Sequence, residues 1–458
     1  MSLDLKKCFF LFSMIFFISV AFTLDISPSL IYQIETTKNS FSYSFFIKND
    51  IPVESIVNIE IIDFITDGKN YVFDDPTYNY SLKKYVKLRE STYKLALQEQ
   101  REVVIDFDVP VDFPGASGVF ALKISQESAS TGKVQIKLNY IVPFFVRFKN
   151  IPVYQSIKIL NLSVRDLSKE PDESYGDFGS LITLEIENNG NVAFIPKGTV
   201  QISSRDLKTT ITEVPLDSFD LVIFPERKTY YTFYVPYVLP TGKVDFILSG
   251  KSYDKDFYTN ATFVNNEQPK ESMYSFQQNI ILFSEKSKNV NQSVVMFNLS
   301  PFKENISLST ENPDIVFSPK KLTVYPYKSV TFSVKTTQKD FNFSGDKIYA
   351  VSVFSDDGSK KKTINNLFLV LRGNSITPNL EAKMINKSSS TVLQVTNTGD
   401  CLLEFNILQN GKILNESQLV IFPGQTMNFD FERFVQSTGF SVEYNVYKET
   451  KKFIIDKF

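Results

Sequence analysis

The sequence contains no histidine and no tryptophan, and it has only two cysteines among its 458 residues. Without histidine, the usual general base of serine and cysteine hydrolases and the commonest metal ligand are both missing. Cys8 lies in an apolar leader, so a mature chain keeps Cys401 alone and no intramolecular disulfide is expected. The net charge of -2 provides no basic field that would gather phosphates, so nucleic acid is not an expected partner.

Helical periodicity is also scarce, and many stretches instead alternate apolar and polar residues. Ser40 to Lys48 and Val57 to Ile65 show the period of two that is typical of half-buried antiparallel strands. Turn signals recur every eight to twelve residues or so, which favours sandwiches of about 100 residues each. The predicted fold class is therefore all-β, with tandem immunoglobulin-like β-sandwich domains.

One strand-turn-strand unit recurs four times along the chain. Its clearest copy is Leu221 to Val235, in which proline ends the first strand because it cannot donate to a sheet ladder. The proline positions of the four copies are Gln98, Pro225, Pro326 and Pro423. Each copy is followed by a glycine that opens another strand, namely Gly118, Gly242, Gly345 and Gly439. Because order and spacing recur together, the sequence predicts four related domains in a row.

The leader and the polar breaks between the repeats place the predicted boundaries. Lys6-Lys7, the apolar run Cys8 to Val20 and the small residues Ser19 and Ala21 are typical of a cleaved secretory signal, with an uncleaved anchor as the alternative. We predict a signal peptide over residues 1–21 and domains over residues 22–149, 150–266, 267–374 and 375–458. The mature chain is expected to be extracytoplasmic, in the periplasm, at the cell surface or secreted, with no transmembrane span after signal cleavage.

Several motifs of the first domain occur together. They are the Ser27-Pro28 strand, the strand ending near Lys48-Asn49-Asp50, Asp63-Phe64 with Asp67-Gly68, the strand pair at Leu95 to Pro110, Pro114-Gly115 and a long last strand. With these motifs the chain resembles exported bacterial tandem immunoglobulin-like proteins whose first domain is related to the PapD-type pilus chaperones. In those chaperones, basic residues of the first and last strands grip the carboxylate of a bound subunit. Here Lys137 lies in the last strand, whereas Asp25 to Ile34 contains no Arg or Lys.

The last strand of the first domain, Val134 to Phe148, is the candidate partner-binding element. An exposed strand edge can pair with a partner, the main chain supplying affinity and alternate side chains choosing the partner. The candidate residues are Val134, Ile136, Lys137, Leu138, Tyr140 and Val142. The alternative is that this strand packs within its own sheet, because its apolar side chains would also fill an ordinary core.

Few residues suggest catalysis or metal binding. Asp106 and Asp108 share one face of a strand, but with Glu102 nearby they are typical of a solvated face and do not define a pair of glycosidase carboxylates. Two aspartate clusters lack the ligand spacing of a calcium loop: Asp63, Asp67, Asp74 and Asp75, and the turn Asp356-Asp357-Gly358. We therefore predict a chain that is not an enzyme and needs no cofactor.

The sequence leaves two functions open. The first is a non-enzymatic exported protein of the cell envelope that binds or scaffolds through its sandwiches, with an envelope protein or a surface polymer as partner. The alternative is a periplasmic chaperone or assembly factor that donates a strand to secreted or pilus-like subunits. A carbohydrate-active enzyme with catalytic carboxylates is a third class, and turnover of glycans would identify it.

Overall fold

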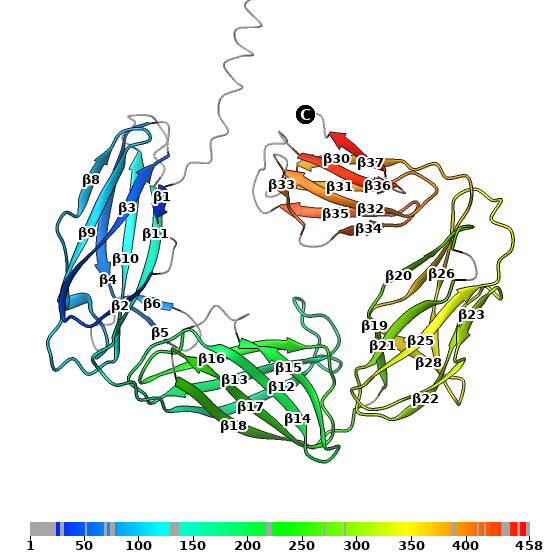
Figure 1. Cartoon of the computed structure of the whole chain (residues 1–458), viewed down its shortest axis with the longest axis horizontal. Helices are drawn as coiled ribbons and strands as arrows, with labels where there is room; N and C mark the ends of the chain where they lie inside the picture. The colour runs from blue at the N-terminus through cyan, green and yellow to red at the C-terminus, as the bar shows by residue number, and fades with distance from the viewer. Residues whose placement is uncertain are drawn as a thin grey trace, which may run out of the picture. The chain divides into compact units, whose positions relative to one another are not determined.

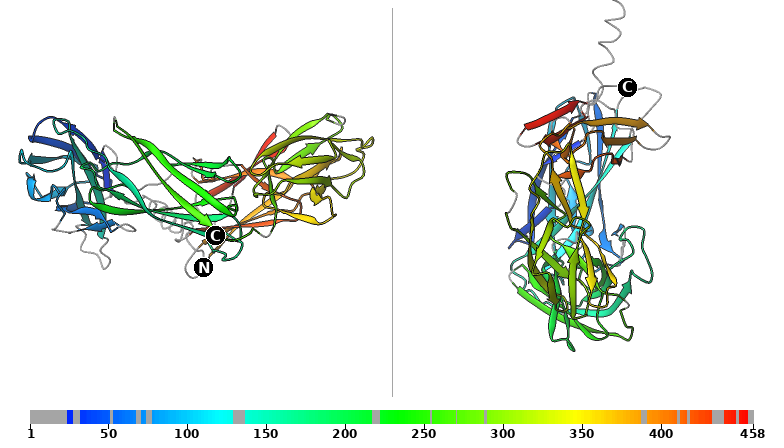
Figure 2. Two further views of the ribbon diagram at one scale, coloured as in Figure 1. Left: turned by 90° about the horizontal axis from the view of Figure 1, so that it is seen from below. Right: turned by 90° about the vertical axis from the view of Figure 1, so that its right-hand side faces the viewer.

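The computed structural model describes residues 24–27, 32–50, 53–67, 71–73, 78–128, 137–216, 222–253, 255–269, 271–287, 290–386, 391–409, 412–415, 418–431, 440–446 and 449–454. Across these residues the chain is built from β-strands, and the one helical element is the short 3-10 helix η1 (Lys83–Tyr85) (Figures 1 and 2). The predicted all-β class with tandem immunoglobulin-like sandwiches is confirmed. The predicted signal peptide lies outside the described residues. In the described part of the chain, no helix has the length and apolar character needed to cross a membrane.

The first sandwich consists of two sheets that share a single core. One sheet has the order β1 (Leu24–Ser27), β3 (Ser40–Asn49), β9 (Gln100–Asp108), β7 (Val86–Leu88). The other has the order β2 (Tyr32–Thr36), β11 (Lys137–Phe148), β10 (Ser117–Ser128), β4 (Ser55–Ile62), β8 (Thr92–Leu95), and β5 (Phe64–Thr66) pairs with β6 (Tyr71–Phe73). The chain changes sheets early, because β1 pairs antiparallel with β3 whereas β2 pairs parallel with β11.

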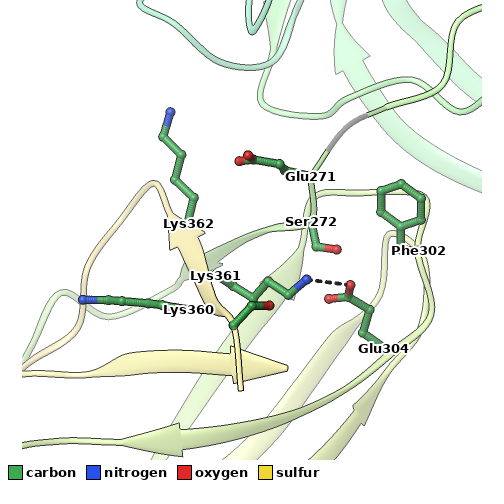
Figure 3. A pocket seen from close by; sticks show the side chains of 8 residues that line it. Glu271, Ser272, Phe302, Glu304, Lys360, Lys361 and Lys362 are labelled. Carbon is green, nitrogen blue, oxygen red and sulfur yellow. Dashed lines mark hydrogen bonds and ion pairs between the residues drawn. The ribbon is translucent and has the colours of Figure 1, made fainter. Parts of the chain in front are cut away.

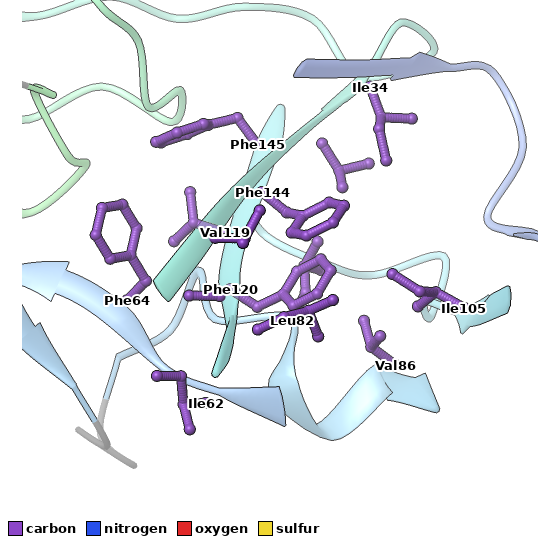
Figure 4. Packing of buried hydrophobic residues seen from close by; sticks show 14 of the residues in the cluster. Ile34, Ile62, Phe64, Leu82, Val86, Ile105, Val119, Phe120, Phe144 and Phe145 are labelled. Carbon is purple, nitrogen blue, oxygen red and sulfur yellow. The ribbon is translucent and has the colours of Figure 1, made fainter. Parts of the chain in front are cut away.

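Aromatic rings fill the core of the first sandwich (Figure 4). Phe120 and Phe144, from neighbouring strands, stack with ring centroids 4.7 Å apart, and Phe107 of the opposite sheet meets Phe120 edge to face at 5.7 Å. All three side chains are buried. Burial of one such side chain contributes about 1.5–3 kcal/mol, so this cluster holds the two sheets together without any disulfide.

The second sandwich follows the same plan with seven strands. Its three-stranded sheet has the order β12 (Ile157–Asp166), β13 (Ser180–Asn188), β16 (Arg227–Val235). Its four-stranded sheet has the order β15 (Thr209–Pro215), β14 (Lys197–Ser204), β17 (Gly242–Ser252), β18 (Lys255–Asn265). Burial alternates along β13 and β16, as the period-two pattern of their sequences predicts.

The chain divides into two compact units, Met1–Pro236 with Thr241–Glu267, and Tyr237–Pro240 with Gln268–Phe458. The four predicted domain boundaries stay predictions. In the second unit, the third sandwich contains β19 (Met273–Phe276), β20 (Ile280–Phe283), β21 (Gln292–Asn298), β22 (Glu304–Ser309), β23 (Ile315–Ser318), β24 (Lys321–Val324), β25 (Ser329–Thr336), β26 (Asp346–Ala350), β27 (Ser352–Ser355), β28 (Lys360–Thr363) and β29 (Phe368–Arg372). The fourth contains β30 (Leu380–Asn386), β31 (Thr391–Asn397), β32 (Leu403–Gln409), β33 (Lys412–Ile413), β34 (Leu419–Ile421), β35 (Thr426–Phe431), β36 (Phe440–Val446) and β37 (Glu449–Ile454).

The two arms of the repeated strand-turn-strand unit pair with different partners and not with each other, so its interpretation as a hairpin was wrong, and we call the unit a corner. In the first sandwich β8 pairs with β4 and β9 pairs with β3. In the third, β24 pairs with β22 and β25 with β21, and in the fourth, β34 pairs with β32 and β35 with β31. In the second, Ile223 forms a single bridge to Phe194 while β16 pairs with β13. Alternation shows that one face of a strand is buried, but it does not identify the neighbouring strand.

Each corner turns at one residue with a left-handed backbone. These residues are Gln98 (φ 62°), Glu226 (φ 56°), Tyr327 (φ 53°) and Gly424 (φ 74°). The last three of these residues directly follow the prolines of their copies. In the first copy the residue before Gln98 is Leu97, so Leu97 stands at the proline position. The prediction that Gln98 occupies the proline position was therefore wrong by one residue. Only the fourth corner uses glycine, the residue that adopts this conformation without strain.

A buried asparagine ends the strand that faces each corner. In Asn49, Asn188, Asn298 and Asn397, the side-chain Nδ2 donates to the carbonyl oxygen four residues further on, at 2.7–2.9 Å. At two of these places a glycine follows two residues after the asparagine, a sequence that is typical of turns with a left-handed backbone. Neither Gly190 nor Gly399 has a positive φ; their N–H groups instead donate to the Oδ1 atoms of Asn188 and Asn397. The asparagine therefore acts through its side chain, not through its backbone.

Candidate functional site

Strand β11 is paired along the whole of one edge but only along part of the other. Its register with β10 is continuous from Lys137 to Arg147. On the second edge, β2 pairs only with Phe144 to Phe148 of β11. Within the part of the chain that the structure describes, no strand pairs with the second edge of residues 137–143. These seven residues, which we call the open edge, are the candidate functional site.

The hydrogen bonds at the end of β11 show which residues direct their main chain to the open edge. Phe148 N donates to Ala116 O, next to β10, at 2.9 Å, and Lys149 N donates to Thr36 O, next to β2, at 2.7 Å. Successive residues of a strand point their N–H and C=O groups to opposite edges. The odd-numbered residues of β11 therefore face the edge on which β2 lies.

Along the open edge this alternation assigns N–H and C=O groups of Asn139 and Ile141 to the unpaired side. Pro143 lies on the same side but has no N–H, and it stands where the pairing with β2 ends. Lys137, which is also odd-numbered, is the first residue of β11 whose main-chain groups face this edge. The open edge thus presents alternating donors and acceptors over five residues and ends at a proline.

Three of the predicted site residues have side chains that the structure describes, and these three point to the interior of the sandwich. Leu138, Tyr140 and Val142 lie opposite Gln126, Ile124 and Leu122 of β10 in register. Val142 is wholly buried, whereas Leu138 and Tyr140 are partly exposed, and Tyr140 Oη accepts a hydrogen bond from Leu24 N at 3.2 Å. Val134 and Ile136 lie outside the described residues, as does the side chain of Lys137. These alternate side chains thus face the core, while no strand of the described residues pairs with part of the main-chain edge.

A polar network, which sequence reasoning missed, closes the core beside the open edge. Gln126 is 1% exposed, and its Nε2 donates to Asn49 Oδ1 at 3.1 Å and to Ser55 Oγ at 3.2 Å. Buried polar groups are held in this way only when their partners are in place. The signal in the sequence was a single glutamine at an inward position of an alternating strand, which is too common a feature to single out.

A second feature of the first unit is a small hollow at the junction of the first and second sandwiches. Its volume is about 200 Å³, and it is lined by Gln33, Phe145, Phe194, Ile195, Lys197, Lys251 and Tyr253. Lys197 and Lys251 lie directly opposite each other in the β14–β17 register. Like charges in this arrangement are destabilising, and Lys251 approaches the carboxylate of Asp256 only to 4.0 Å at an exposed position. The two lysines are therefore suited to share an anionic group.

Tyr253, which lines this hollow, is held by several contacts. Tyr253 Oη donates to Ala193 O at 3.3 Å, and burial raises the pKa of Tyr253 to about 12, so the hydroxyl stays protonated. The guanidinium of Arg147 lies 5.8 Å from the centre of the Tyr253 ring. Arg147 donates to the carbonyl oxygens of Ala116 at 2.8 Å and of Ile151 at 3.2 Å. The guanidinium of Arg147 thus binds main-chain carbonyl groups at the junction of the two sandwiches.

A larger hollow, of about 650 Å³, lies in the third sandwich (Figure 3). At its base Lys361 Nζ lies 3.1 Å from Glu304 Oε1, and Tyr274 Oη donates to Glu304 Oε2 at 2.5 Å. Burial raises the pKa of Glu304, but hydrogen bonds from Ser272, Tyr274 and Lys361 outweigh it, and the net shift is downward. The charged groups at the base satisfy one another, so the arrangement serves structure.

The aspartates considered from the sequence take structural roles where they are described. Asp106 accepts hydrogen bonds from Arg89 and Ser42, which lower its pKa to about 2. Asp63 is buried and accepts a hydrogen bond from Ser81. Asp74 and Asp75 lie outside the described residues. Among the residues that the structure describes, no group of three or more His, Cys, Asp or Glu side chains is placed to hold a metal ion.

No protein-family model and no curated protein matches the chain. Among solved structures, it is similar to the CsuC–CsuE chaperone-tip adhesion subunit complex of Acinetobacter baumannii, with 14% identity, a TM-score of 0.27, and 46% of this chain and 90% of that chain covered. The Class 5 fimbriae chaperone CfaA matches with 14% identity, a TM-score of 0.30 and coverage of 53% and 99%. The periplasmic chaperone SfaE matches with 12% identity, a TM-score of 0.24 and coverage of 40% and 100%. The similar solved structures are thus pilus chaperones, the family that the first domain resembles in sequence.

Proposed function

We propose that this chain is a non-enzymatic, extracytoplasmic protein that captures an extended segment of a partner protein on the open edge of β11. The observation that carries the proposal is that no strand of the described residues pairs with the second edge of residues 137–143. Unpaired N–H and C=O groups of an edge strand form a template for another strand, and such addition is an established mode of peptide recognition. This function corresponds to the chaperone or assembly-factor alternative more closely than to general scaffolding.

The side chains of β11 define what kind of segment fits. A captured strand would continue the row of β2 and extend the sheet, so every second side chain would face the interior beside Leu138 and Tyr140. Both of these side chains are partly exposed, whereas Val142, deeper in the strand, is already covered. A segment with alternating apolar residues would cover the exposed parts of both side chains. The expected partner is therefore a subunit with an unprotected, alternating apolar strand.

The hollow at the junction supports the same class of partner. In the chaperones that the first domain resembles, basic residues grip a subunit carboxylate, and the first strand here has none. Lys197 and Lys251 of the second sandwich supply two positive charges instead, beside Gln33 of β2 and Phe145 of β11. We assign to these two lysines the binding of an acidic group of the captured segment. The resulting hydrogen bonds would be charge-assisted, which adds specificity as well as affinity.

A proline substitution on the open edge tests the proposal. Ile141→Pro removes one outward N–H and leaves the ladder to β10 intact, and Pro143 shows that this side of the strand accommodates proline. Ile141→Ala is the matched control, because it shortens the same side chain and keeps the N–H. The mature chain, residues 22 to 458, is used for affinity capture from the extracytoplasmic fraction of its source, followed by mass spectrometry.

A discrete protein that is retained by the wild type and by Ile141→Ala but lost with Ile141→Pro is the expected result. Equal retention by the proline variant would rule out main-chain pairing at this edge. Retention of a surface polymer without any protein would return the function to envelope scaffolding. Circular dichroism of both variants checks that the strand content is unchanged.

A further inference from the structure

Nine Asn-x-Ser/Thr triplets occur in the chain, and partner capture at the open edge makes no use of them. This triplet is the acceptor of N-linked glycans in secreted proteins. The nine asparagines are Asn79, Asn161, Asn260, Asn291, Asn298, Asn305, Asn342, Asn386 and Asn415. A glycan is joined to the side-chain Nδ2 atom, so the burial and the contacts of that atom decide which triplets are suited to carry one.

Three of the asparagines use their Nδ2 atoms within the fold. Asn298 is wholly buried, and its Nδ2 donates to Phe302 O at 2.7 Å. The Nδ2 atoms of Asn79 and Asn415 donate to side-chain oxygens at 3.3 Å and 2.9 Å. The side chain of Asn386 lies outside the described residues. The other five asparagines are exposed: Asn161, Asn260, Asn291, Asn305 and Asn342.

A β-bulge turns Asn161 outward on strand β12. The register of β12 with β13 shifts between Ile159 and Asn161, and Leu160 and Asn161 are exposed one after the other. Without this shift, strict alternation would turn Asn161 toward the interior of the sandwich. Its Oδ1 accepts from Leu162 N at 2.9 Å, and its Nδ2 has no acceptor among the described residues. Ser163, which completes the triplet, is exposed on the same face.

Asn260 lies near the middle of β18, on the outward face of its sheet. The side chain is exposed and has no partner among the residues that the structure describes. Tyr258 and Val264 share this face because the period of a strand is two, and they are 63% and 51% exposed. From Phe257 to Asn265 the strand contains no charged residue. Its outward face thus exposes two apolar side chains on either side of Asn260.

Strands β12 and β18 are the last strands of their sheets, and they lie beside each other. In the described part of the chain, no strand pairs with the second edge of either. Leu160, next to Asn161, is 43% exposed, so apolar side chains face solvent on both strands. Proteins protect such strands with lysine, proline or a short length, whereas β18 has 11 residues and no charge over its outer part. A bulky, hydrated glycan on each strand would give the same protection.

We propose that Asn161 and Asn260 carry N-linked glycans, which cover β12 and β18. Transfer joins Nδ2 to the anomeric carbon of a sugar that a lipid carries through a diphosphate. The new C–N bond replaces the bond between that carbon and a diphosphate oxygen, one Nδ2 proton is released, and the lipid diphosphate leaves. The proposal rests on the extracytoplasmic location in the proposed function, but it does not rest on capture of a partner.

The two triplets differ in when transfer can take place. Ser163 is exposed and has no partner among the described residues, so the triplet of Asn161 is accessible in the folded chain. Thr262 Oγ1 donates to Asp245 Oδ1 at 2.6 Å, so the hydroxyl of the triplet of Asn260 is engaged once β18 has paired. Transfer to Asn260 is therefore expected before β18 joins its sheet.

The placement of the two glycans leaves the open edge of β11 uncovered. On the second sandwich, glycans on β12 and β18 would keep a foreign strand from adding to either edge. Residues 80–160, which include the open edge, contain no acceptor triplet. The first sandwich would thus keep the edge that the proposed function uses.

Mass spectrometry of the protein from its own source tests the proposal. The chain is purified from the extracytoplasmic and the cytoplasmic fractions, and electron-transfer fragmentation of its peptides locates added sugar. Sugar on Asn161 and Asn260 but not on the buried control Asn298 is the expected result. An extracytoplasmic chain in which Asn161 and Asn260 are unmodified would overturn the glycans and leave partner capture standing. A chain found only in the cytoplasmic fraction would instead overturn the location on which both proposals rest.

Substitution of both asparagines tests the protective role. Asn161→Gln with Asn260→Gln, produced in the source, should lose both sugars and aggregate faster in light scattering by roughly a factor of two or more. Asn428→Gln is the matched control, because Asn428 is exposed on a strand but does not belong to a triplet. A double variant that loses its sugars and aggregates no faster than this control would refute the cover of β12 and β18.

Discussion

Replacing Asn397 with alanine removes the side chain on which the fourth corner is built. Asn397 is wholly buried, and its Nδ2 donates to Cys401 O at 2.8 Å and to Ile421 O at 3.1 Å, while its Oδ1 accepts from Gly399 N at 3.0 Å. Alanine leaves two carbonyl groups and one N–H without these partners. At about 1 kcal/mol for each lost hydrogen bond, Asn397→Ala should lower the free energy of unfolding of the fourth sandwich by about 3 kcal/mol.

Cys401 provides an assay for this loss. Its thiol is buried, and burial raises its pKa to about 11, so it reacts slowly in the folded protein. A chain that begins at residue 22 contains no other cysteine, so thiol labelling in low urea reports opening around this residue alone. A loss of about 3 kcal/mol corresponds to labelling that is faster by a factor of roughly 100 when opening is at equilibrium.

A surface asparagine of the same sandwich is the control. Asn428 is exposed and accepts one hydrogen bond from Gln394 Nε2 at 3.0 Å, so Asn428→Ala should change stability by no more than about 0.5 kcal/mol. Amide exchange of β32 separates opening of the whole sandwich from loosening near Cys401. If Asn397→Ala labels no faster than Asn428→Ala, the buried amide does not support the corner and the reasoning fails.

Two further changes examine the corner backbone and a surface ion pair. Gln98→Gly removes the strain of a left-handed non-glycine residue and should raise the free energy of unfolding by up to about 1 kcal/mol. Gly424→Ala introduces that strain and should lower the free energy of unfolding by about the same amount. Urea titration measures both changes, and a change of the same sign in the two variants would contradict the shared backbone geometry. Arg89 and Ser42 hold the pKa of Asp106 at about 2, so its stabilising effect is present above about pH 4 and is lost as the pH falls toward 2. Asp106→Asn should therefore be less stable than the wild type near pH 7 and equal to it near pH 2 in thermal melts, and a difference that persists unchanged at pH 2 would refute this.

Much of the fold could be predicted from local sequence pattern. Alternation over Ser40 to Lys48 and over Thr229 to Val235 identified strands that the structure contains as β3 and β16. The partners of these strands could not be predicted, because burial of one face is the same whichever strand lies beside it. For that reason a change of partner strand at each corner appeared in the sequence as a hairpin. The absence of proline in the first copy also displaced its alignment by one residue, from Leu97 to Gln98.

The corner asparagines show a different limit of sequence reasoning. Asn188 and Asn397 stand before glycine-containing turns, and asparagine in such places often adopts a left-handed backbone. Their buried Nδ2 groups instead bind carbonyls four residues ahead, an arrangement that depends on where the opposite strand places its main chain. A spacing of four residues between an asparagine and a carbonyl carries no signal, because every residue has a carbonyl. Only the recurrence of asparagine at the same place in four sandwiches could have revealed it.

The candidate site illustrates the same point at the level of the main chain. The sequence drew attention to the alternate side chains Leu138, Tyr140 and Val142, and the structure turns these toward the core. The main-chain groups that no described strand pairs with belong to Asn139 and Ile141, whose side chains gave no reason to choose them. An unpaired strand edge promotes unwanted aggregation, and proteins commonly shorten or block such edges. Pro143 limits this edge to its first few residues, so it would pair with a short segment of a partner and could not extend into an open sheet.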